Sequence, residues 1–349
     1  MPMIAPSVRQ KLALFIDLVR LEQTLFALPF AYAGMLLAGR GWPSWTQLFW
    51  VSLAMFGART AGMAANRWID WHIDALNPRT ASRALPAGRV GGSSVVLLAL
   101  ASLGLLALAA AQLNPLCFQL WPLAAFLLLG YSYTKRFTWL CHLWLGVVQA
   151  CAPIGGWLAV GGEWAATPLW LGLAILTWVA GFDVLYACQD YDHDRAHRLH
   201  SIPARFGIGR AFRLSEALHG LTLLSLMAVG YTAGLGLGYA TALLLIALLL
   251  VYQHRILKPD DLSQIQRAFF SANVGISLTL LGALLSAMAG PARLAGVPTM
   301  HDFLVRGFRA FKEIGGASEF LRRIHARERP ILRELYAGAS TGWTRPPAS

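Results

Sequence analysis

Long apolar segments separated by short polar loops run through most of the chain. Most of them contain about 17–25 residues, the length at which a helix rising 1.5 Å per residue crosses roughly 30 Å of hydrocarbon. The pattern therefore predicts an all-α, polytopic membrane protein with about nine transmembrane helices. The predicted helices cover residues 11–39, 45–68, 93–112, 115–133, 140–160, 167–187, 212–235, 238–256 and 268–290.

The composition supports this fold class. Of the 349 residues, 56% are hydrophobic and 13% are charged, whereas soluble domains contain about 45–50% apolar and about 25% charged residues. These values exclude a disordered chain, a coiled coil and a disulfide scaffold. The four cysteines form no CxxC pair, so we expect them to be reduced packing residues.

Basic residues are distributed unevenly among the loops. Arg and Lys gather after the second, fourth, sixth and eighth predicted helices, and the opposite loops have almost none. The positive-inside rule then places the N-terminus and the basic loops in the cytoplasm. Contact of these loops with anionic membrane lipid explains the net charge of +12. Because no basic segment is interleaved with stacking aromatic residues, we expect no nucleic-acid partner.

The C-terminal segment differs from the rest of the chain. We predict a transmembrane domain at 1–290, followed by a basic polar tail at 291–349. Nine crossings place this tail outside, although its ten Lys and Arg residues would favour the inside. Recurring Phe and Leu residues among its charges predict one or two surface helices that lie on the membrane.

Acidic residues cluster at the cytoplasmic ends of the second and sixth predicted helices. Asn66, Asp70 and Asp74 are spaced so that one helical face carries all three, and Asp190 and Asp194 have the same spacing. Two facing carboxylate pairs provide the hard oxygen ligands that suit Mg²⁺. The sequence therefore predicts that Mg²⁺ holds a diphosphate between the two helices, with arginines balancing the charge.

Three other interpretations compete with this one. A single Asp pair would be typical of a solvated loop, but two pairs with equal spacing in an acid-poor chain disfavour it. Nearby histidines suggest a zinc site, which the surrounding aspartates make unfavourable. A cation-coupled transporter is the main alternative function, but its acidic residues would be expected at mid-membrane rather than at helix ends.

These segments resemble the UbiA superfamily of intramembrane aromatic prenyltransferases over about residues 11–290. The family has an NDxxDxxxD motif after its second helix and a DxxxD motif after its sixth, and Arg67 departs from the first by replacing an Asp. The first-helix phrase at 21–32 is similar to the branch that contains 4-hydroxybenzoate polyprenyltransferases. The matching segments are 66–74, 190–194, Tyr133-Thr134-Lys135-Arg136 and Ser201-Ile202-Pro203.

The resemblance implies a ring of nine helices around a central cavity and a reaction in which a polyprenyl group moves from its diphosphate to an aromatic carboxylic acid. The acceptor would be of the 4-hydroxybenzoate or 1,4-dihydroxy-6-naphthoate type, in ubiquinone or menaquinone biosynthesis. It also implies a bacterial inner-membrane protein whose active site faces the cytoplasm. The expected catalytic residues and Mg²⁺ ligands are Asp70, Asp74, Asp190 and Asp194, and the expected substrate-binding residues are Asn66, Arg20, Arg83, Lys135, Arg136, Tyr186 and Asp183.

Overall fold

The computed structural model describes residues 14–16, 18–19, 21–38 and 42–289, without the side chains of 21–26, 270 and 288–289. These residues contain no β-strand of a sheet and nine helices of 17 residues or more. The nine are α2 (Leu21–Ala38), α3 (Trp45–Ile69), α5 (Gly92–Leu113), α6 (Pro115–Thr134), α7 (Cys141–Ala159), α8 (Ala166–Ala187), α11 (Ile208–Thr232), α12 (Leu237–Ile256) and α14 (Asn273–Ala289). The predicted all-α class is confirmed.

Six apolar segments within the described residues are long and hydrophobic enough to cross a membrane. They are Trp45–Ile69, Gly92–Leu113, Pro115–Thr134, Cys141–Ala159, Ala166–Ala196 and Leu237–Ile256. Two shorter apolar helices lie at Ala27–Ala38 and Asn273–Ala287, and α11 begins with the charged residues Arg210, Arg213 and Glu216. The protein is therefore an integral membrane protein, while nine crossings stay a prediction.

The long helices pack side by side as one bundle. The most extensive contacts join α3 to α5, α8 to both α7 and α11, and α2 to α7. Glycines allow the closest approach: a Cβ atom at Gly34 of α2 would overlap the carbonyl oxygen of Pro153 in α7, and one at Gly156 would overlap that of Ala31. Small residues at such crossings are typical of membrane helices, which associate through close packing.

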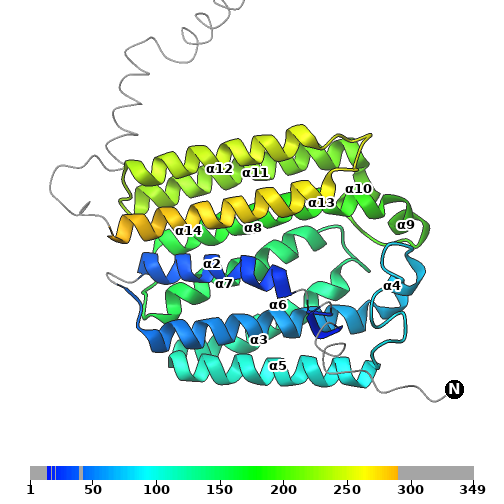
Figure 1. The fold of residues 1–349 in the computed structure, drawn as a ribbon, viewed down its shortest axis with the longest axis horizontal. Helices are drawn as coiled ribbons and strands as arrows, with labels where there is room; N and C mark the ends of the chain where they lie inside the picture. Colours follow the sequence, from blue (N-terminus) through cyan, green and yellow to red (C-terminus); the bar gives the residue numbers. More distant parts are fainter. Residues whose placement is uncertain (1–13, 17, 20, 39–41, 290–349) are drawn as a thin grey trace, which may run out of the picture. The chain divides into compact units, whose positions relative to one another are not determined.

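The short helices gather at one end of this bundle (Figure 1). They include α4 (Trp71–Leu76), α9 (Tyr191–Ala196) and α10 (Ile202–Phe206), which follow α3 and α8 along the chain. A single 3₁₀ turn at Cys188–Asp190 joins α8 to α9, and a π-helical turn at Ala268–Ala272 precedes α14. Both acidic motifs, 66–74 and 190–194, thus lie where a long helix gives way to a short one.

The first acidic motif bends at its centre. Helix α3 ends at Ile69, and Asp70 leaves the regular helical conformation before α4 begins at Trp71. Even so, the amide of Asp70 donates to the carbonyl of Asn66 at 2.9 Å, and the amide of Asp74 donates to the carbonyl of Asp70 at 2.7 Å. The helical spacing of these three residues is therefore kept through the bend, as their sequence spacing predicts.

Candidate active site

Both acidic motifs line one polar pocket of about 190 Å³. Its walls come from the ends of α3, α6, α7 and α8, from α4 and α9, and from the loops that follow α4 and α9. The structure therefore brings together two motifs that are more than a hundred residues apart in the sequence. The polar residues around this pocket include Asn66, Asp70, Asp74, Asn77, Arg79, Arg83, Tyr131, Ser132, Lys135, His142, Asp183, Tyr186, Asp190, His193, Asp194 and Ser201.

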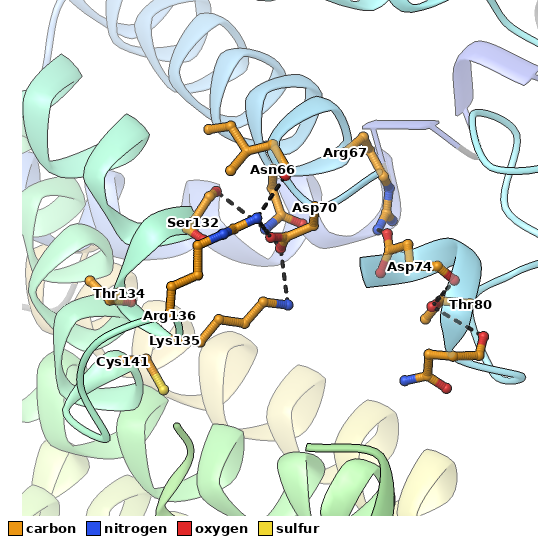
Figure 2. Close-up of polar contacts among 12 residues, drawn as sticks. Asn66, Arg67, Asp70, Asp74, Thr80, Ser132, Thr134, Lys135, Arg136 and Cys141 are labelled. Carbon is orange, nitrogen blue, oxygen red and sulfur yellow. Dashed lines mark hydrogen bonds and ion pairs between the residues drawn. The ribbon is translucent and has the colours of Figure 1, made fainter. Parts of the chain in front are cut away.

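Asp70 is the most heavily contacted carboxylate of the first motif (Figure 2). It is 2% exposed, and its Oδ2 atom accepts a hydrogen bond from Nδ2 of Asn66 at 2.8 Å. Nζ of Lys135 lies 3.1 Å from the same oxygen, and Nη2 of Arg136 lies 3.0 Å from Oδ1. Two cations at the end of α6 thus balance one buried carboxylate at the end of α3.

Arg136 also joins the two helices through their backbones. Its guanidinium donates to the carbonyl of Ser132 at 2.6 Å and to the carbonyl of Ile69 at 2.7 Å. These contacts use the planar arrangement of guanidinium donors to bind the last turns of α6 and α3 at once. Arg136 is not among the residues described as lining the polar pocket, so its predicted contact with a substrate stays a prediction.

Asp74 is held by two arginines. Nη1 of Arg83 lies 2.6 Å from its Oδ2 atom, and Nη1 of Arg67 lies 4.0 Å from the same oxygen. Arg67 is 5% exposed and Asp74 is also 5% exposed, so the pair is shielded from solvent. The arginine that departs from the family motif therefore adds positive charge next to a motif carboxylate.

Asp190 of the second motif is bound from the loop that follows the first. The guanidinium of Arg79 donates to both of its oxygens, from Nε to Oδ1 at 2.9 Å and from Nη2 to Oδ2. Nδ2 of Asn77 donates to Oδ1 at 2.8 Å. Burial acts to lower the pKa of Arg79, but its hydrogen bonds with Asp190 and the Asp190 charge outweigh burial and raise the pKa. Arg79 is therefore a permanent cation.

Asp183 lies two turns before the second motif and Tyr186 one turn before it, both on the pocket side of α8. Oδ2 of Asp183 is 2.7 Å from Nδ1 of His142 in α7, so its partner is a histidine rather than an arginine. The ring of Tyr186 lies under the guanidinium carbon of Arg79 at 5.5 Å from the ring centroid. Its hydroxyl is within 3.5 Å of Nε2 of Gln266.

Most predicted site residues therefore lie in or next to one pocket. Arg20, which was also predicted to bind substrate, lies outside the described residues. Reasoning from the sequence missed Asn77, Arg79, Ser132 and His142 as site residues. Arg79 was recognised only as one of the basic loop residues, and Asn77 and Ser132 carry no charge. His142 is a lone histidine near the start of an apolar helix, and that isolation is the signal that could have revealed it.

The oxygen-rich chemistry of the pocket suits a hard cation. Within the described part of the chain, no three His, Cys, Asp or Glu residues are arranged closely enough to hold a metal ion. Asp70, Asp74 and Asp190 each face a basic side chain. Oδ1 of Asp70 is buried and accepts no hydrogen bond from any described residue, although Arg136 is nearby. The donor set is thus compatible with Mg²⁺.

A second, apolar cavity of about 290 Å³ lies farther along the same helices. Arg59 of α3 and Leu128 of α6 line it, about two turns and one turn from the residues of these helices that line the polar pocket. Other residues of α3 and α6 also line it, together with residues of α2, α5 and α7 and with Trp164. Apart from Arg59 and Gln149, the side chains that line it carry no hydrogen-bonding amide or charge.

Both the sequence and the fold of the chain are similar to those of known proteins. The sequence matches the UbiA prenyltransferase family over residues 27–275. The chain belongs to this family. The 4-hydroxybenzoate octaprenyltransferase of Aeromonas salmonicida is 33% identical over 281 residues, which are 78% of this chain and 95% of that protein. The protein of the same name from Vibrio campbellii is 29% identical over 277 residues, 78% of this chain and 96% of that protein.

Solved structures of UbiA homologues have the same fold. The apo structure of a UbiA homologue from Aeropyrum pernix K1 has a TM-score of 0.70 and 33% sequence identity, and covers 76% of this chain and 98% of that chain. A homologue from Archaeoglobus fulgidus bound to DMAPP and Mg²⁺ has a TM-score of 0.63 at 18% identity, covering 79% and 99%. The protein is thus a prenyltransferase of the UbiA type, and the transporter hypothesis is set aside.

The C-terminal part of the chain has a second similarity. Residues 264–342 match a domain of unknown function, DUF8198. This match overlaps the end of the UbiA match at 264–275, before and at the start of α14. The surface helices predicted for 291–349 lie outside the described residues.

Proposed function

We propose that this UbiA-family protein transfers a polyprenyl group from its diphosphate to an aromatic carboxylic acid that carries a phenol. The observation that carries the proposal is the single polar pocket in which Asp70, Asp74, Asp190 and Asp194 converge with basic side chains, next to an apolar cavity. The name shared by the Aeromonas and Vibrio relatives supports an acceptor of the 4-hydroxybenzoate type. An acceptor of the 1,4-dihydroxy-6-naphthoate type has the same phenol and carboxylate.

The four motif aspartates would hold Mg²⁺ together with the diphosphate. Magnesium usually binds one or two carboxylates, waters and substrate phosphates, and the pocket presents carboxylates from two directions. When bound, the ion neutralises negative charge on the leaving diphosphate. Asn66, which donates to Asp70 at 2.8 Å, keeps this carboxylate oriented.

The basic residues that face these aspartates supply the remaining charge. Arg79, Arg83 and Lys135 pair with Asp190, Asp74 and Asp70 and line the same pocket. With a diphosphate bound, these basic side chains would donate hydrogen bonds to its phosphate oxygens. Fixed positive charge where the leaving group develops negative charge is an effective way to accelerate such a reaction.

The apolar cavity provides space for the prenyl chain. It follows the polar pocket along α3 and α6, so a diphosphate in the pocket would direct its hydrocarbon chain into it. Apolar walls also exclude water from the allylic carbon. The carbon–oxygen bond between the prenyl group and the diphosphate breaks, and its electron pair leaves with the diphosphate. The ring carbon next to the phenol forms a carbon–carbon bond with the allylic carbon. The proton that this ring carbon loses passes to the released diphosphate. Tyr186, which lines the polar pocket, would stabilise the developing cation through its aromatic ring.

The membrane arrangement follows from the same residues. We infer that the pocket faces the cytoplasm of a bacterial inner membrane, because the loops that form it carry Arg79, Arg83, Lys135 and Arg136. A prenyl diphosphate and an aromatic acid each carry a charged group that stays in water, so a pocket at the cytoplasmic end of the bundle can accept both.

The proposal is tested with membranes that contain the protein and with matched membranes that lack it. Radiolabelled prenyl diphosphate is incubated with Mg²⁺ and with 4-hydroxybenzoate or 1,4-dihydroxy-6-naphthoate, and label in the lipid-soluble aromatic product is counted. We expect protein-dependent labelling of one of these acids. Diphosphate consumption without a labelled product from either acid would contradict an acceptor of this class.

A further inference from the structure

His142 is a buried histidine that the proposed reaction does not yet use. It is the second residue of α7, a helix long and apolar enough to span a membrane, and it is 3% exposed. Its ring lies between α8 and the start of α10: Nδ1 is 2.7 Å from Oδ2 of Asp183, and Nε2 is 3.3 Å from the backbone nitrogen of Ile202. Ionisable residues inside a membrane bundle are usually functional.

These two contacts determine which ring nitrogen carries the proton. A backbone N–H can only donate, so Nε2 of His142 must accept the hydrogen bond from Ile202. Nδ1 therefore carries the hydrogen of the neutral ring and donates it to Asp183. The backbone of the loop after the second motif thus fixes the tautomer of His142, and His142 in turn fixes the carboxylate of Asp183.

The oriented carboxylate faces the polar pocket. Both His142 and Asp183 line it, and the Asp183 side chain retains 20% exposure whereas that of His142 retains 4%. Because His142 occupies Oδ2, the other oxygen of Asp183 is the one available to a ligand. Asp183 differs from the motif aspartates that pair with arginine or lysine, because its partner is the histidine ring of His142.

We propose that His142 is a positioning residue that holds Asp183 to accept a hydrogen bond from the phenol hydroxyl of the aromatic acceptor. This inference rests on the proposed function. A carboxylate that accepts from the hydroxyl increases electron density at the neighbouring ring carbon, where the new bond forms, and keeps that carbon directed at the prenyl cation. The acceptor is thereby oriented at α7 and α8, while the diphosphate is bound by the motif residues.

Two substitutions separate orientation from packing. In His142→Asn the side-chain amide can reproduce the donor at the Nδ1 position, whereas in His142→Gln the amide extends toward the Nε2 position and the donor to Asp183 is lost. His72→Gln, on the exposed surface of α4, is the matched control. Full-length protein in lipid nanodiscs is assayed with each substrate varied in turn.

We expect His142→Gln and Asp183→Asn to lower kcat by about 10- to 100-fold, the size of loss seen when the hydrogen-bond partner that orients a metal-ligating residue is removed. The KM for the prenyl diphosphate should not change, and His142→Asn should recover most of the lost kcat. The double variant His142→Gln/Asp183→Asn should be no slower than Asp183→Asn alone, because the two residues act as one unit. A wild-type kcat in His142→Gln, or equal losses in the Asn and Gln variants, would overturn the proposal.

A second measurement does not depend on catalysis. Nitrogen-15 NMR of wild-type protein with labelled histidine should show His142 protonated at Nδ1 and unprotonated at Nε2. Protonation at Nε2 would contradict the proposed orientation of Asp183. Because this measurement uses wild-type protein, it can be made even if a His142 variant fails to insert into the membrane. Wild-type protein that labels neither aromatic acid would contradict the proposed function, and the NMR result would still decide whether His142 donates to Asp183.

Discussion

The side-chain amide of Asn77 donates a hydrogen bond of 2.8 Å to Oδ1 of Asp190. Asn77 follows the first acidic motif, and Asp190 begins the second, so this bond joins the end of α4 to the 3₁₀ turn after α8, across the polar pocket. Arg79, two residues later, binds the same carboxylate. The loop after the first motif is therefore positioned by the second motif, and the site requires both halves of the chain to be in place.

The bidentate contact of Arg79 leads to a prediction. Arg79→Lys keeps the positive charge but loses the planar pair of donors that binds both oxygens of Asp190. We expect the KM for prenyl diphosphate to rise by about tenfold, corresponding to roughly 1.4 kcal/mol. Arg210→Lys, at an exposed position, is the control. Equal kinetics for the two variants in steady-state assays would show that charge alone matters at Arg79.

The contacts of Arg136 predict that this residue stabilises the ends of α3 and α6 rather than binding a ligand. A lysine ammonium cannot reach the carbonyls of Ser132 and Ile69 and the carboxylate of Asp70 in the same planar geometry. We expect Arg136→Lys to lower the thermal unfolding temperature in detergent and to reduce kcat through displacement of Asp70. Kinetic constants and melting temperature are measured on the same preparation. An unchanged melting temperature with a raised KM for the aromatic acid would favour a direct substrate contact instead.

The close packing of α2 against α7 can be tested by substituting Gly156 of α7. A valine at Gly156 would place its Cβ against the carbonyl oxygen of Ala31, whereas the space around Gly104 in α5 is open. Gly156→Val should therefore separate the helices and reduce the yield of monodisperse protein by size-exclusion chromatography. Gly104→Val should behave like wild type, since it meets no described atom within 4 Å. Similar yields for the two variants would contradict the close crossing.

The tail offers a test of where the catalytic unit ends. The UbiA match stops at residue 275, and all described site residues precede α14. We expect a protein that ends after Gly290 to retain prenyl transfer, with any loss confined to expression or membrane insertion. Activity is expressed per amount of inserted protein, measured by immunoblotting of washed membranes. Inserted but inactive protein would show that the tail contributes to the site.

Helix positions and motif convergence were predictable because both depend on regular spacing. Apolar runs of membrane-spanning length identified the long helices, and repeated four-residue spacing placed Asp70 with Asp74 and Asp190 with Asp194. The two motifs meet because each follows a helix whose end reaches the same side of the bundle. Charge balance could also be anticipated for Arg83 and Lys135, which lie in the basic loops.

Other features depend on contacts that spacing does not encode. His142 meets Asp183 only because α7 packs against α8, and a single histidine has no periodic pattern. The guanidinium of Arg136 binds backbone carbonyls, which every sequence provides. Arg67 looked like a lost acidic ligand, yet it lies 4.0 Å from Asp74, so its role could be recognised only from the arrangement of α3 and α4.

The central claim is that the motif carboxylates hold Mg²⁺ and diphosphate for prenyl transfer, and Asp190→Ala tests it most directly beside Asp192→Ala. Asp192 belongs to the same motif but is exposed and outside the residues that line the pocket. Label transfer is measured with equal amounts of each inserted protein, with Mg²⁺ and after EDTA. We predict that Asp190→Ala loses more than about tenfold in rate, over roughly 1.4 kcal/mol, that Asp192→Ala does not, and that EDTA abolishes wild-type transfer until Mg²⁺ is restored. Wild-type rates in Asp190→Ala, or transfer that persists in EDTA, would contradict the account.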